Sequence, residues 1–375
     1  MDSFLRFAQT KHKDIVASIR EFVECESPSN HVPGINRFVE LLSDHVTDIA
    51  KIKKLSGGHL RVEFALPGKK KAGQLLALGH SDTVWELGTL RTMPFREEKG
   101  RLWGPGVLDM KAGLAFFIFG MRALRELDVP VPRKVVLQIN ADEEVGSDSS
   151  RAFTEDAARS SAAVLVLEPG TGLEGKLKTA RKGVGDYTIV VRGKASHAGV
   201  DFANGANAIV EMARQLERIA GFTQLDRGVT VSPGVIQGGT RSNVVPAECR
   251  AEVDIRVPRD RDRIYLEKKF SSLKPFDKRC AIEITGGLNR PPMERSAGVR
   301  KLYKTAEKLA AELGVTLQES STGGGSDGNF TAALGVPTLD GLGAVGEGAH
   351  APNESILVNR IADRTALLAK LICSL

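Results

Sequence analysis

Three apolar runs in the first half of the chain alternate with segments that have helical periodicity. The runs are QLLALGH at residues 74–80, RKVVLQIN at 133–140 and AAVLVLEP at 162–169. Helix-like segments lie before and between them, at residues 4–25, 34–46, 110–127 and 148–158. Strands and helices that alternate in this way favour a sheet covered by helices on both faces. The alternation therefore predicts the α/β fold class.

The order of the predicted elements changes in residues 180–290. The strand-like and helix-like segments follow there in the order β-α-β-β-α-β, which is typical of a ferredoxin-like plait that can fold as one unit. After Pro291 and Pro292 the alternation resumes, with helices at 298–313 and 356–375 and strands at 315–319 and 336–340. The predicted organisation is one α/β domain, residues 1–179 and 291–375, interrupted by an inserted domain of residues 180–290.

The length and charge of the chain limit its class. A chain of 375 residues is too long for one simple core, which agrees with two domains. The net charge of +6, from 52 Lys+Arg against 46 Asp+Glu, is scattered. Its densest runs, at residues 51–54 and 68–71, contain no aromatic residues, which argues against nucleic-acid binding. A mildly basic enzyme with anionic substrates fits this charge.

Cysteine spacing and hydropathy indicate a cellular location. The four cysteines are far apart and form no CxxC pair, which is typical of thiols in a reducing compartment. No apolar run nears 18 residues, and the amphipathic N-terminal segment lacks the apolar core of a signal peptide. We expect a cytoplasmic protein with no membrane partner.

Acidic residues and histidines follow the apolar runs. His80 and Asp82 end the first run in GHSDTVWELG, the acids of NADEEVG follow the second, and Glu168 lies in the third. Asp109 precedes a helix in WGPGVLDMKAG, and His350 lies in GEGAHAPNES before the last helix. Each residue taken alone has a structural interpretation. His80 can be a satisfied histidine at a strand end, Asp109 a helix N-cap, and the acids of NADEEVG a solvated loop.

Taken together, these residues predict a metal centre. In an α/β sheet, loops at the carboxyl ends of the strands converge on one site. Two histidines and three or four carboxylates match the ligands of two divalent cations, Zn²⁺ in the first place, with Co²⁺ or Mn²⁺ as alternatives. Cations would also neutralise carboxylates that could not otherwise be buried together.

Five motifs give the chain a family resemblance. GHSDTV, GPGVLDMKAG, ADEEVGS, GKASHAG and GGTRSNVVP occur in the order found in the dizinc exopeptidases and deacylases. The chain resembles this family over nearly its whole length. The family includes glutamate carboxypeptidase (carboxypeptidase G), acetylornithine deacetylase, succinyl-diaminopimelate desuccinylase, aminoacylase and cytosolic dipeptidases. Glutamate in LEPG resembles the glutamate carboxypeptidase branch most closely.

The resemblance implies a role for each site residue. One metal would bind His80 and Glu168, the other would bind Glu144 and His350, and Asp109 would bridge both, with a cis peptide to Met110. Glu143 would be the general base that moves protons during hydrolysis, and Asp82 would orient His80. The inserted domain would serve as a lid and dimerisation domain, and its His197 would reach the active site of a partner subunit.

Residues for substrate binding are implied in the same way. An exopeptidase must recognise a free carboxylate, for which the forked arginine side chain is suited. Arg256 in VDIRVP and Arg290 in GGLNRPPM resemble the carboxylate-binding arginines of the glutamate carboxypeptidase branch. The remaining substrate-binding candidates are Asn243, Lys176 and Gly325. Arg256, Arg290 and Lys176 can each also be interpreted as a solvated cation on the surface.

The predicted function is zinc-dependent hydrolysis of an amide bond that releases a C-terminal amino acid. The predicted substrate is a small peptide or an N-acyl amino acid, and the predicted assembly is a homodimer formed through residues 180–290. An N-acyl amino-acid or acetylornithine-type deacylase is an alternative with the same chemistry. A non-catalytic metal-binding scaffold is a third alternative, which the presence of Glu143, Asp82 and all five predicted ligands disfavours.

Overall fold

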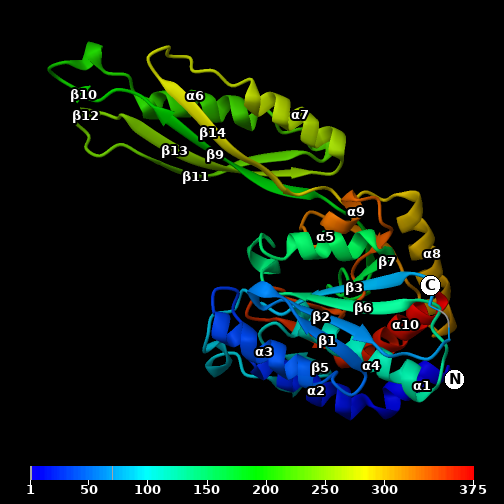
Figure 1. Ribbon diagram of the computed structural model, residues 1–375. Helices are drawn as coiled ribbons and strands as arrows, with labels where there is room; N and C mark the ends of the chain where they lie inside the picture. The colour runs from blue at the N-terminus through cyan, green and yellow to red at the C-terminus, as the bar shows by residue number, and fades with distance from the viewer. Residues whose placement is uncertain (1, 70) are drawn as a thin grey trace. The chain divides into compact units, whose positions relative to one another are not determined.

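The computed structural model describes residues 2–69 and 71–375, which form two compact units (Figure 1). The first unit comprises the residues up to Ala180 together with Arg295–Thr322 and Ser326–Leu375. The second comprises Arg181–Glu294 and Gly323–Gly325. The glycines of this last segment were assigned to the α/β domain by the sequence division, but they cluster with the inserted unit.

The first unit is built on a six-stranded sheet with the strand order β1-β2-β6-β3-β7-β16. The first two strands form an antiparallel hairpin, and β6, β3, β7 and β16 run parallel to one another. The strands span Ala50–Lys54 (β1), Leu60–Phe64 (β2), Lys134–Asn140 (β6), Gln74–His80 (β3), Ser161–Val166 (β7) and Thr338–Leu339 (β16). The α/β class predicted from the alternation is confirmed.

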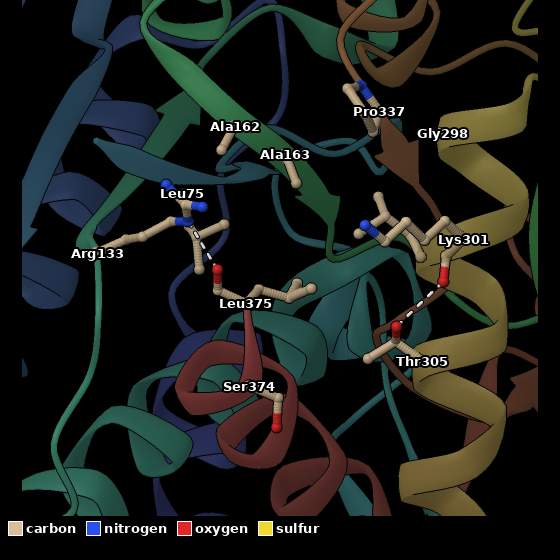
Figure 2. Close-up of a pocket in the computed structure, with 11 residues that line it drawn as sticks. Leu75, Arg133, Ala162, Ala163, Gly298, Lys301, Thr305, Pro337, Ser374 and Leu375 are labelled. Carbon is tan, nitrogen blue, oxygen red and sulfur yellow. Dashed lines mark hydrogen bonds between the residues drawn. The ribbon is translucent and has the colours of Figure 1, made fainter. Parts of the chain in front are cut away.

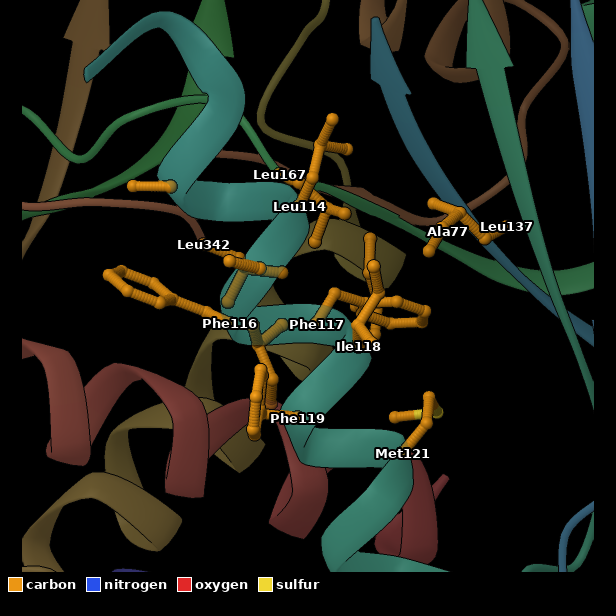
Figure 3. Packing of buried hydrophobic residues seen from close by; sticks show 14 of the residues in the cluster. Ala77, Leu114, Phe116, Phe117, Ile118, Phe119, Met121, Leu137, Leu167 and Leu342 are labelled. Carbon is orange, nitrogen blue, oxygen red and sulfur yellow. The ribbon is translucent and has the colours of Figure 1, made fainter. Parts of the chain in front are cut away.

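Helices cover both faces of this sheet, so the central strand β3 is buried along its whole length and its residues are mainly apolar. Leu75 and Ala77 of β3 pack into the larger core, whereas Leu76 and Leu78, which point to the other face, pack in a smaller cluster with residues of α5. In the larger core, Leu114 of α4 lies on the side of the helix that faces Ala77 and Leu137 of the sheet, whereas Phe116 points to the opposite side (Figure 3). The helices of the larger core are α1 (Ser3–Thr10), α2 (His12–Glu24), α3 (Val32–Asp44), α4 (Ala112–Glu126), α8 (Ala297–Glu312) and α10 (Ile361–Ser374), whereas α5 (Arg151–Arg159) and α9 (Gly328–Ala333) lie on the opposite side of the sheet (Figure 1).

Short strands organise the loops of the first unit. A four-stranded sheet has the order β17-β18-β5-β4, and β15 pairs with β8. Their bounds are Gly346–Glu347 (β17), Ser355–Leu357 (β18), Arg101–Trp103 (β5), Arg96–Glu98 (β4), Glu319–Thr322 (β15) and Leu177–Arg181 (β8). Because β18 pairs with β5, the loop that carries His350 is tied to the segment that leads to Asp109.

The second unit has the predicted β-α-β-β-α-β order. Its antiparallel sheet has the strand order β11-β13-β9-β14, which is that of a ferredoxin-like plait. The elements are β9 (Gly183–Arg192), α6 (Ala208–Ala220), β11 (Thr230–Gly238), β13 (Glu248–Val257), α7 (Asp260–Ser271) and β14 (Ala281–Arg290). A two-stranded ribbon of β10 (Ser196–His197) and β12 (Val244–Val245) extends this unit.

Two predicted elements near the C-terminus were wrong in their bounds. Residues 315–318 form no strand, and the strand predicted there is β15, Glu319–Thr322. The last helix begins at Ile361 rather than at residue 356, because the apolar residues of Ser355–Leu357 pair with β5 as a strand. Within the described residues, every helix is too short or too polar to span a lipid bilayer.

Candidate metal centre

Neighbouring parallel strands deliver the predicted ligands to one edge of the sheet. His80 is the last residue of β3, and its sheet partner in β6 is Asn140, which starts the NADEEVG loop. Glu168 lies two residues beyond the end of β7, the neighbour of β3 on the other side. The carboxyl ends of these strands therefore meet, as they do at ligand sites of other α/β sheets.

Two clusters of candidate ligands share Asp109. The first is His80, Asp109 and Glu168, and the second is Asp109, Glu144 and His350; within each cluster the ligand atoms lie within 4.8 Å of one another. The two oxygens of Asp109 are divided between the clusters, with Oδ1 3.2 Å from His80 Nε2 and Oδ2 3.6 Å from His350 Nε2. All five predicted metal ligands are thus brought together.

Each histidine also faces the carboxylate of its own cluster. His80 Nε2 is 3.5 Å from Glu168 Oε1, and His350 Nε2 is 3.3 Å from Glu144 Oε2. The side chain of Glu144 is only 7% exposed, so the interpretation of this acid as part of a solvated loop is wrong. The N-cap interpretation of Asp109 is wrong as well, because α4 has its N-cap at Lys111 and no side chain caps it. The Asp109–Met110 peptide is cis, as the resemblance implied.

The clustered charges shift the pKa values of the candidate ligands. Burial lowers the pKa of His80, but hydrogen bonds to Asp109, Asp82 and Glu168 raise it well above 6.5. Hydrogen bonds to Asp109 and Glu144 raise the pKa of His350 to about 10. Burial would raise the pKa of Asp109, yet the two histidines hold it far below 3.8. The acidic groups of the metal centre therefore favour a nearby positive charge. In the metal-free chain this charge is a proton on the histidine side chains.

The donor set fits divalent cations. Burial raises the pKa of Glu144, and the charge of Asp109 adds to this increase, because two carboxylates repel each other in a poorly solvated place. Glu144 Oε1 is buried without a hydrogen-bond partner among the described residues, an arrangement that costs free energy unless a cation lies beside it. Histidine nitrogens with carboxylate oxygens are the ligands that Zn²⁺ and similar metals prefer.

Asp82 links the first ligand to the NADEEVG loop. His80 Nδ1 lies 2.9 Å from the backbone carbonyl of Asp82 and 3.5 Å from its carboxylate. The two carboxylate oxygens accept hydrogen bonds from the backbone N–H groups of Glu143 and Glu144, both at 3.2 Å, and Ser29 Oγ donates to the same carboxylate at 2.7 Å. Asp82 thus contacts the ligand His80 and also holds the backbone of Glu143, the predicted base, and of Glu144, a candidate ligand. The sequence pattern alone did not reveal this second contact.

Asp142, the first acid of the NADEEVG loop, shapes the turn and does not face the metal centre. Its Oδ2 accepts hydrogen bonds from the backbone N–H and the hydroxyl of Ser149, at 2.8 and 2.7 Å. The three consecutive acids therefore have different surroundings.

Two of the predicted catalytic and binding residues lie side by side in the second unit. His197 of β10 is the sheet partner of Val244 in β12, which places it beside Asn243. His197 Nδ1 accepts hydrogen bonds from the backbone N–H groups of Gly199 and Val200, at 3.1 and 3.2 Å. A neutral imidazole with Nδ1 as the acceptor carries its proton on Nε2. The exposed His197 therefore presents a hydrogen-bond donor.

The two predicted carboxylate-binding arginines differ in their surroundings. Arg256 is engaged by Asp254 of the same strand, with Nη2 2.8 Å from Oδ2 and Nε 3.0 Å from Oδ1. Arg290 is buried at the end of β14. A Cβ on Gly325 would lie 2.7 Å from Arg290 Cδ, so the glycine allows the loop to pack closely on this arginine. Arg290 Nη1 donates to Asn289 Oδ1 at 3.1 Å, so both arginines have partners, and both stay predictions as carboxylate-binding residues.

Lys176 lies in a turn of the first unit, where its backbone pairs with Thr171. The nearby Lys178, on β8, is buried, and its positive charge helps to lower the pKa of Asp109. Sequence reasoning selected Lys176 and missed Lys178. The local pattern of LKTAR carries no signal for Lys178, because Leu177, Lys178 and Thr179 are all buried and show no alternation.

Two cavities of the first unit have different relations to the metal centre. A hollow of about 170 Å³ borders Glu144 and is lined by Pro28, Ser29, Asn30, Thr83, Val84, Glu86 and Val145. A larger cavity of about 320 Å³ contains none of the candidate ligands (Figure 2). It lies at the opposite end of the strands, near Leu75 and Ala163, between Arg133 and Lys301. Only the first of these cavities adjoins the metal centre.

An α/β unit with two ligand clusters that share one aspartate, interrupted by a ferredoxin-like plait, defines a metal-dependent hydrolase. Residues 76–374 match the model of peptidase family M20/M25/M40, and the chain belongs to this family. It is therefore a metallopeptidase or a related amidohydrolase with candidate residues for a dinuclear metal site.

The sequence is similar to two relatives with different activities. It is 29% identical to carboxypeptidase G2 of Pseudomonas sp. over 371 residues, which cover 96% of this chain and 89% of the relative. It is 28% identical to a succinyl-diaminopimelate desuccinylase of Cereibacter sphaeroides over 387 residues, with 96% and 98% coverage. The structure is similar to that of aminopeptidase PepT from Bacillus cereus, with a TM-score of 0.81, 22% identity and coverage of 96% and 98%.

Proposed function

We propose that the chain hydrolyses the amide bond that links a C-terminal amino acid to a peptide or an acyl group, in the manner of a glutamate carboxypeptidase. The observation that carries the proposal is the pair of ligand clusters joined by Asp109, with Glu143 beside the ligand Glu144. The similarity to carboxypeptidase G2 over almost the whole chain supports the type of substrate.

The candidate ligands would hold two divalent cations, which we propose to be Zn²⁺, with Co²⁺ or Mn²⁺ as alternatives. His80 and Glu168 would bind one cation, Glu144 and His350 would bind the other, and Asp109 would bridge them. When bound, the cations would supply Lewis acidity to the substrate carbonyl and acidify water.

The protein's own residues would move the proton. Glu143 would take a proton from the attacking water and deliver it to the leaving nitrogen, so that the amide C–N bond breaks as a C–O bond forms. Asp82 would fix Glu143 through the hydrogen bond to its backbone N–H. His197 Nε2–H would donate to the developing oxyanion, and Arg290 with Asn243 would bind the substrate carboxylate and its neighbouring polar groups.

A deacylase that acts on N-acyl amino acids is the second candidate, because the desuccinylase relatives match the chain at nearly the same identity as carboxypeptidase G2. The two functions use the same chemistry and differ in the group on the acyl side of the scissile bond. Among the described residues that line the hollow beside Glu144, Val84 and Val145 are apolar, and none is an arginine or lysine that could pair with a succinyl carboxylate. This lining favours an apolar or aromatic acyl group over succinate.

A panel of substrates tests the proposed function. The metal-loaded protein should release glutamate or another C-terminal amino acid from N-acyl amino acids and dipeptides, as measured by ninhydrin or coupled detection of the free amine. We expect kcat/KM for benzoyl- or peptidyl-amino acids to exceed that for N-succinyl-diaminopimelate and acetylornithine. Hydrolysis of the last two alone would identify a deacylase, and no hydrolysis across the panel by a metal-loaded protein would contradict the proposal.

We also propose a homodimer that forms through the second unit. Its strand β11 lies at the edge of the sheet, and the strand carries the exposed apolar residues Val235 and Ile236. The nearby Phe202 and Val200 are 65% and 83% exposed. An unpaired apolar edge of this kind is a pairing surface for a second copy.

Mixing two inactive variants tests the dimer and the role of His197 together. If His197 acts in the active site of the partner subunit, a heterodimer of His197→Ala and Glu143→Ala contains one complete site. Equal mixing with subunit exchange should therefore restore about a quarter of the wild-type activity. The matched control mixes Glu143→Ala with Asp109→Ala, which damage the same site and should restore none. Sedimentation of a monomer only at micromolar concentration, or failure of the first mixture to recover activity, would contradict the proposal.

A further inference from the structure

The loop that carries His350 contains a second buried acid. Glu354 lies four residues after His350, immediately before β18, and is 0% exposed. Its two carboxylate oxygens accept four hydrogen bonds. Oε1 accepts from the backbone N–H groups of Leu108 and Asp109, at 2.8 and 3.1 Å. Oε2 accepts from the backbone N–H of Gly106 at 2.9 Å and from the indole Nε1 of Trp85 at 2.7 Å.

These hydrogen bonds join three loops that each carry a candidate ligand. Trp85 lies in the segment that begins with His80, the three backbone donors lie in the turn that contains Asp109, and Glu354 belongs to the loop of His350. Each loop leaves a different strand or helix, and the carboxylate of Glu354 links them in addition to the pairing of β18 with β5. The backbone N–H of the shared ligand Asp109 is itself one of the four donors.

We propose that Glu354 is a positioning residue of the metal centre, which holds the shared ligand Asp109 at the correct place between the ligands of the two clusters. The proposal rests on the proposed function in that it takes the five clustered residues as metal ligands. Glu354 does not contact the metals or the substrate and acts through the backbone of Asp109.

This positioning role requires a carboxylate, because both oxygens of Glu354 accept hydrogen bonds. A carboxylate has two oxygens that both accept hydrogen bonds, whereas an amide has one acceptor and one donor. In Glu354→Gln, one pair of donors keeps its acceptor, but the other pair faces an NH₂ group. Because the site is fully buried, water cannot replace the lost acceptor, and the turn that contains Asp109 must shift to relieve the contact.

The buried charge also has a balancing cation. Lys111, two residues after Asp109, is buried, and Glu354 is one of the acids whose charge acts on it. The ammonium group of Lys111 donates to the backbone carbonyl of Cys25 at 2.8 Å. The turn around Asp109 therefore has a buried anion hydrogen-bonded to it and a buried cation two residues after Asp109.

Metal affinity in the absence of substrate tests the proposal. The experiment compares wild type, Glu354→Gln and the matched control Glu347→Gln by competition for Zn²⁺ with a chelating dye. Glu347 is an exposed acid at the end of β17, directly before the loop of His350. Loss of a residue that orients a metal ligand typically weakens metal binding about 10- to 100-fold, and we expect this loss for Glu354→Gln only. The circular dichroism of the metal-free variants should match that of the wild type, which separates positioning from folding.

A second variant keeps the test decisive if Glu354→Gln fails to fold. Trp85→Phe removes one of the four donors and leaves the carboxylate and the three backbone donors in place. We expect a folded protein whose Zn²⁺ affinity is lowered by a smaller factor, about 2- to 10-fold. Wild-type affinity in a folded Glu354→Gln, or in Trp85→Phe when Glu354→Gln is unfolded, would overturn the proposal. Because no substrate is used, a wild type that binds Zn²⁺ but hydrolyses nothing would contradict the proposed function alone.

Discussion

Replacement of Glu143 by alanine should lower kcat by about 10²- to 10⁴-fold while the metal content stays that of the wild type. The expected loss is large because the two acids that precede and follow Glu143 in the NADEEVG loop have other partners. Glu144 is the adjacent acid, but its carboxylate faces His350 at 3.3 Å as a candidate ligand, and Asp142 is bound to Ser149. Steady-state hydrolysis combined with metal analysis of the same samples measures both quantities.

The matched control for this variant is Asp148→Asn, which removes an exposed acid five residues further along the chain. It should keep wild-type activity. Full activity in Glu143→Ala would show that another residue is the base. Loss of metal from Glu143→Ala would instead show that this carboxylate is a ligand, and would exchange the roles of the two adjacent glutamates.

Replacement of Asp109 by alanine should disrupt both metal sites at once. Its Oδ1 faces His80 and its Oδ2 faces His350, so one substitution removes a ligand from each cluster. We expect the bound metal to fall from two ions per chain to fewer than one, and activity to fall on the order of 10³-fold or more, equivalent to about 4 kcal/mol of transition-state stabilisation. Glu168→Ala, which removes a ligand from the first cluster only, should retain one ion.

Metal binding should also release protons. In the metal-free chain the pKa of His350 is raised to about 10 and that of His80 lies well above 6.5, so both imidazoles carry a proton at neutral pH. A metal binds only the neutral imidazole, so its affinity should rise as the pH rises toward about 10 and fall in acid. Calorimetric titration in two buffers with different ionisation enthalpies counts the released protons. Metal binding without proton release would contradict the raised pKa values of the two histidines. Two ions retained by Asp109→Ala would contradict the bridging role of Asp109.

The local sequence pattern was sufficient for the fold class and for the strands that build the site. The run QLLALGH is apolar on both faces, and its predicted bounds are those of β3, because a strand covered by helices on both sides shows an uninterrupted run. The order of elements in the inserted domain also followed from local periodicity. Prediction failed at Ser355–Leu357, where an apolar segment adjoins a helix and only its pairing with β5 makes it a strand.

In the candidate site, too, the local sequence predicted some features, and contacts between distant segments decided others. His80, Asp109, Glu168, His350 and the pair Glu143 and Glu144 were selected because ligand-type residues stand directly after buried strands or in loops beside them. The choice of Glu144 over Glu143 as the ligand came from the family resemblance. Sequence analysis did not select Glu354, since the donors that bind it lie 246 residues earlier for Leu108 and 269 residues earlier for Trp85. The second contact of Asp82, with the backbone of Glu143, spans 61 residues.

The sequence by itself therefore determined the layered α/β architecture, the inserted plait and the identities of the candidate metal ligands, because hydrophobic periodicity and residue type are local properties. The tertiary structure alone showed that Asp82 also binds the backbone of Glu143 and Glu144, and that the buried Glu354 is hydrogen-bonded to the turn that contains Asp109. These features depend on hydrogen bonds and charges between segments far apart in the chain, and such segments meet only when the parallel strands bring their carboxyl ends to one edge of the sheet.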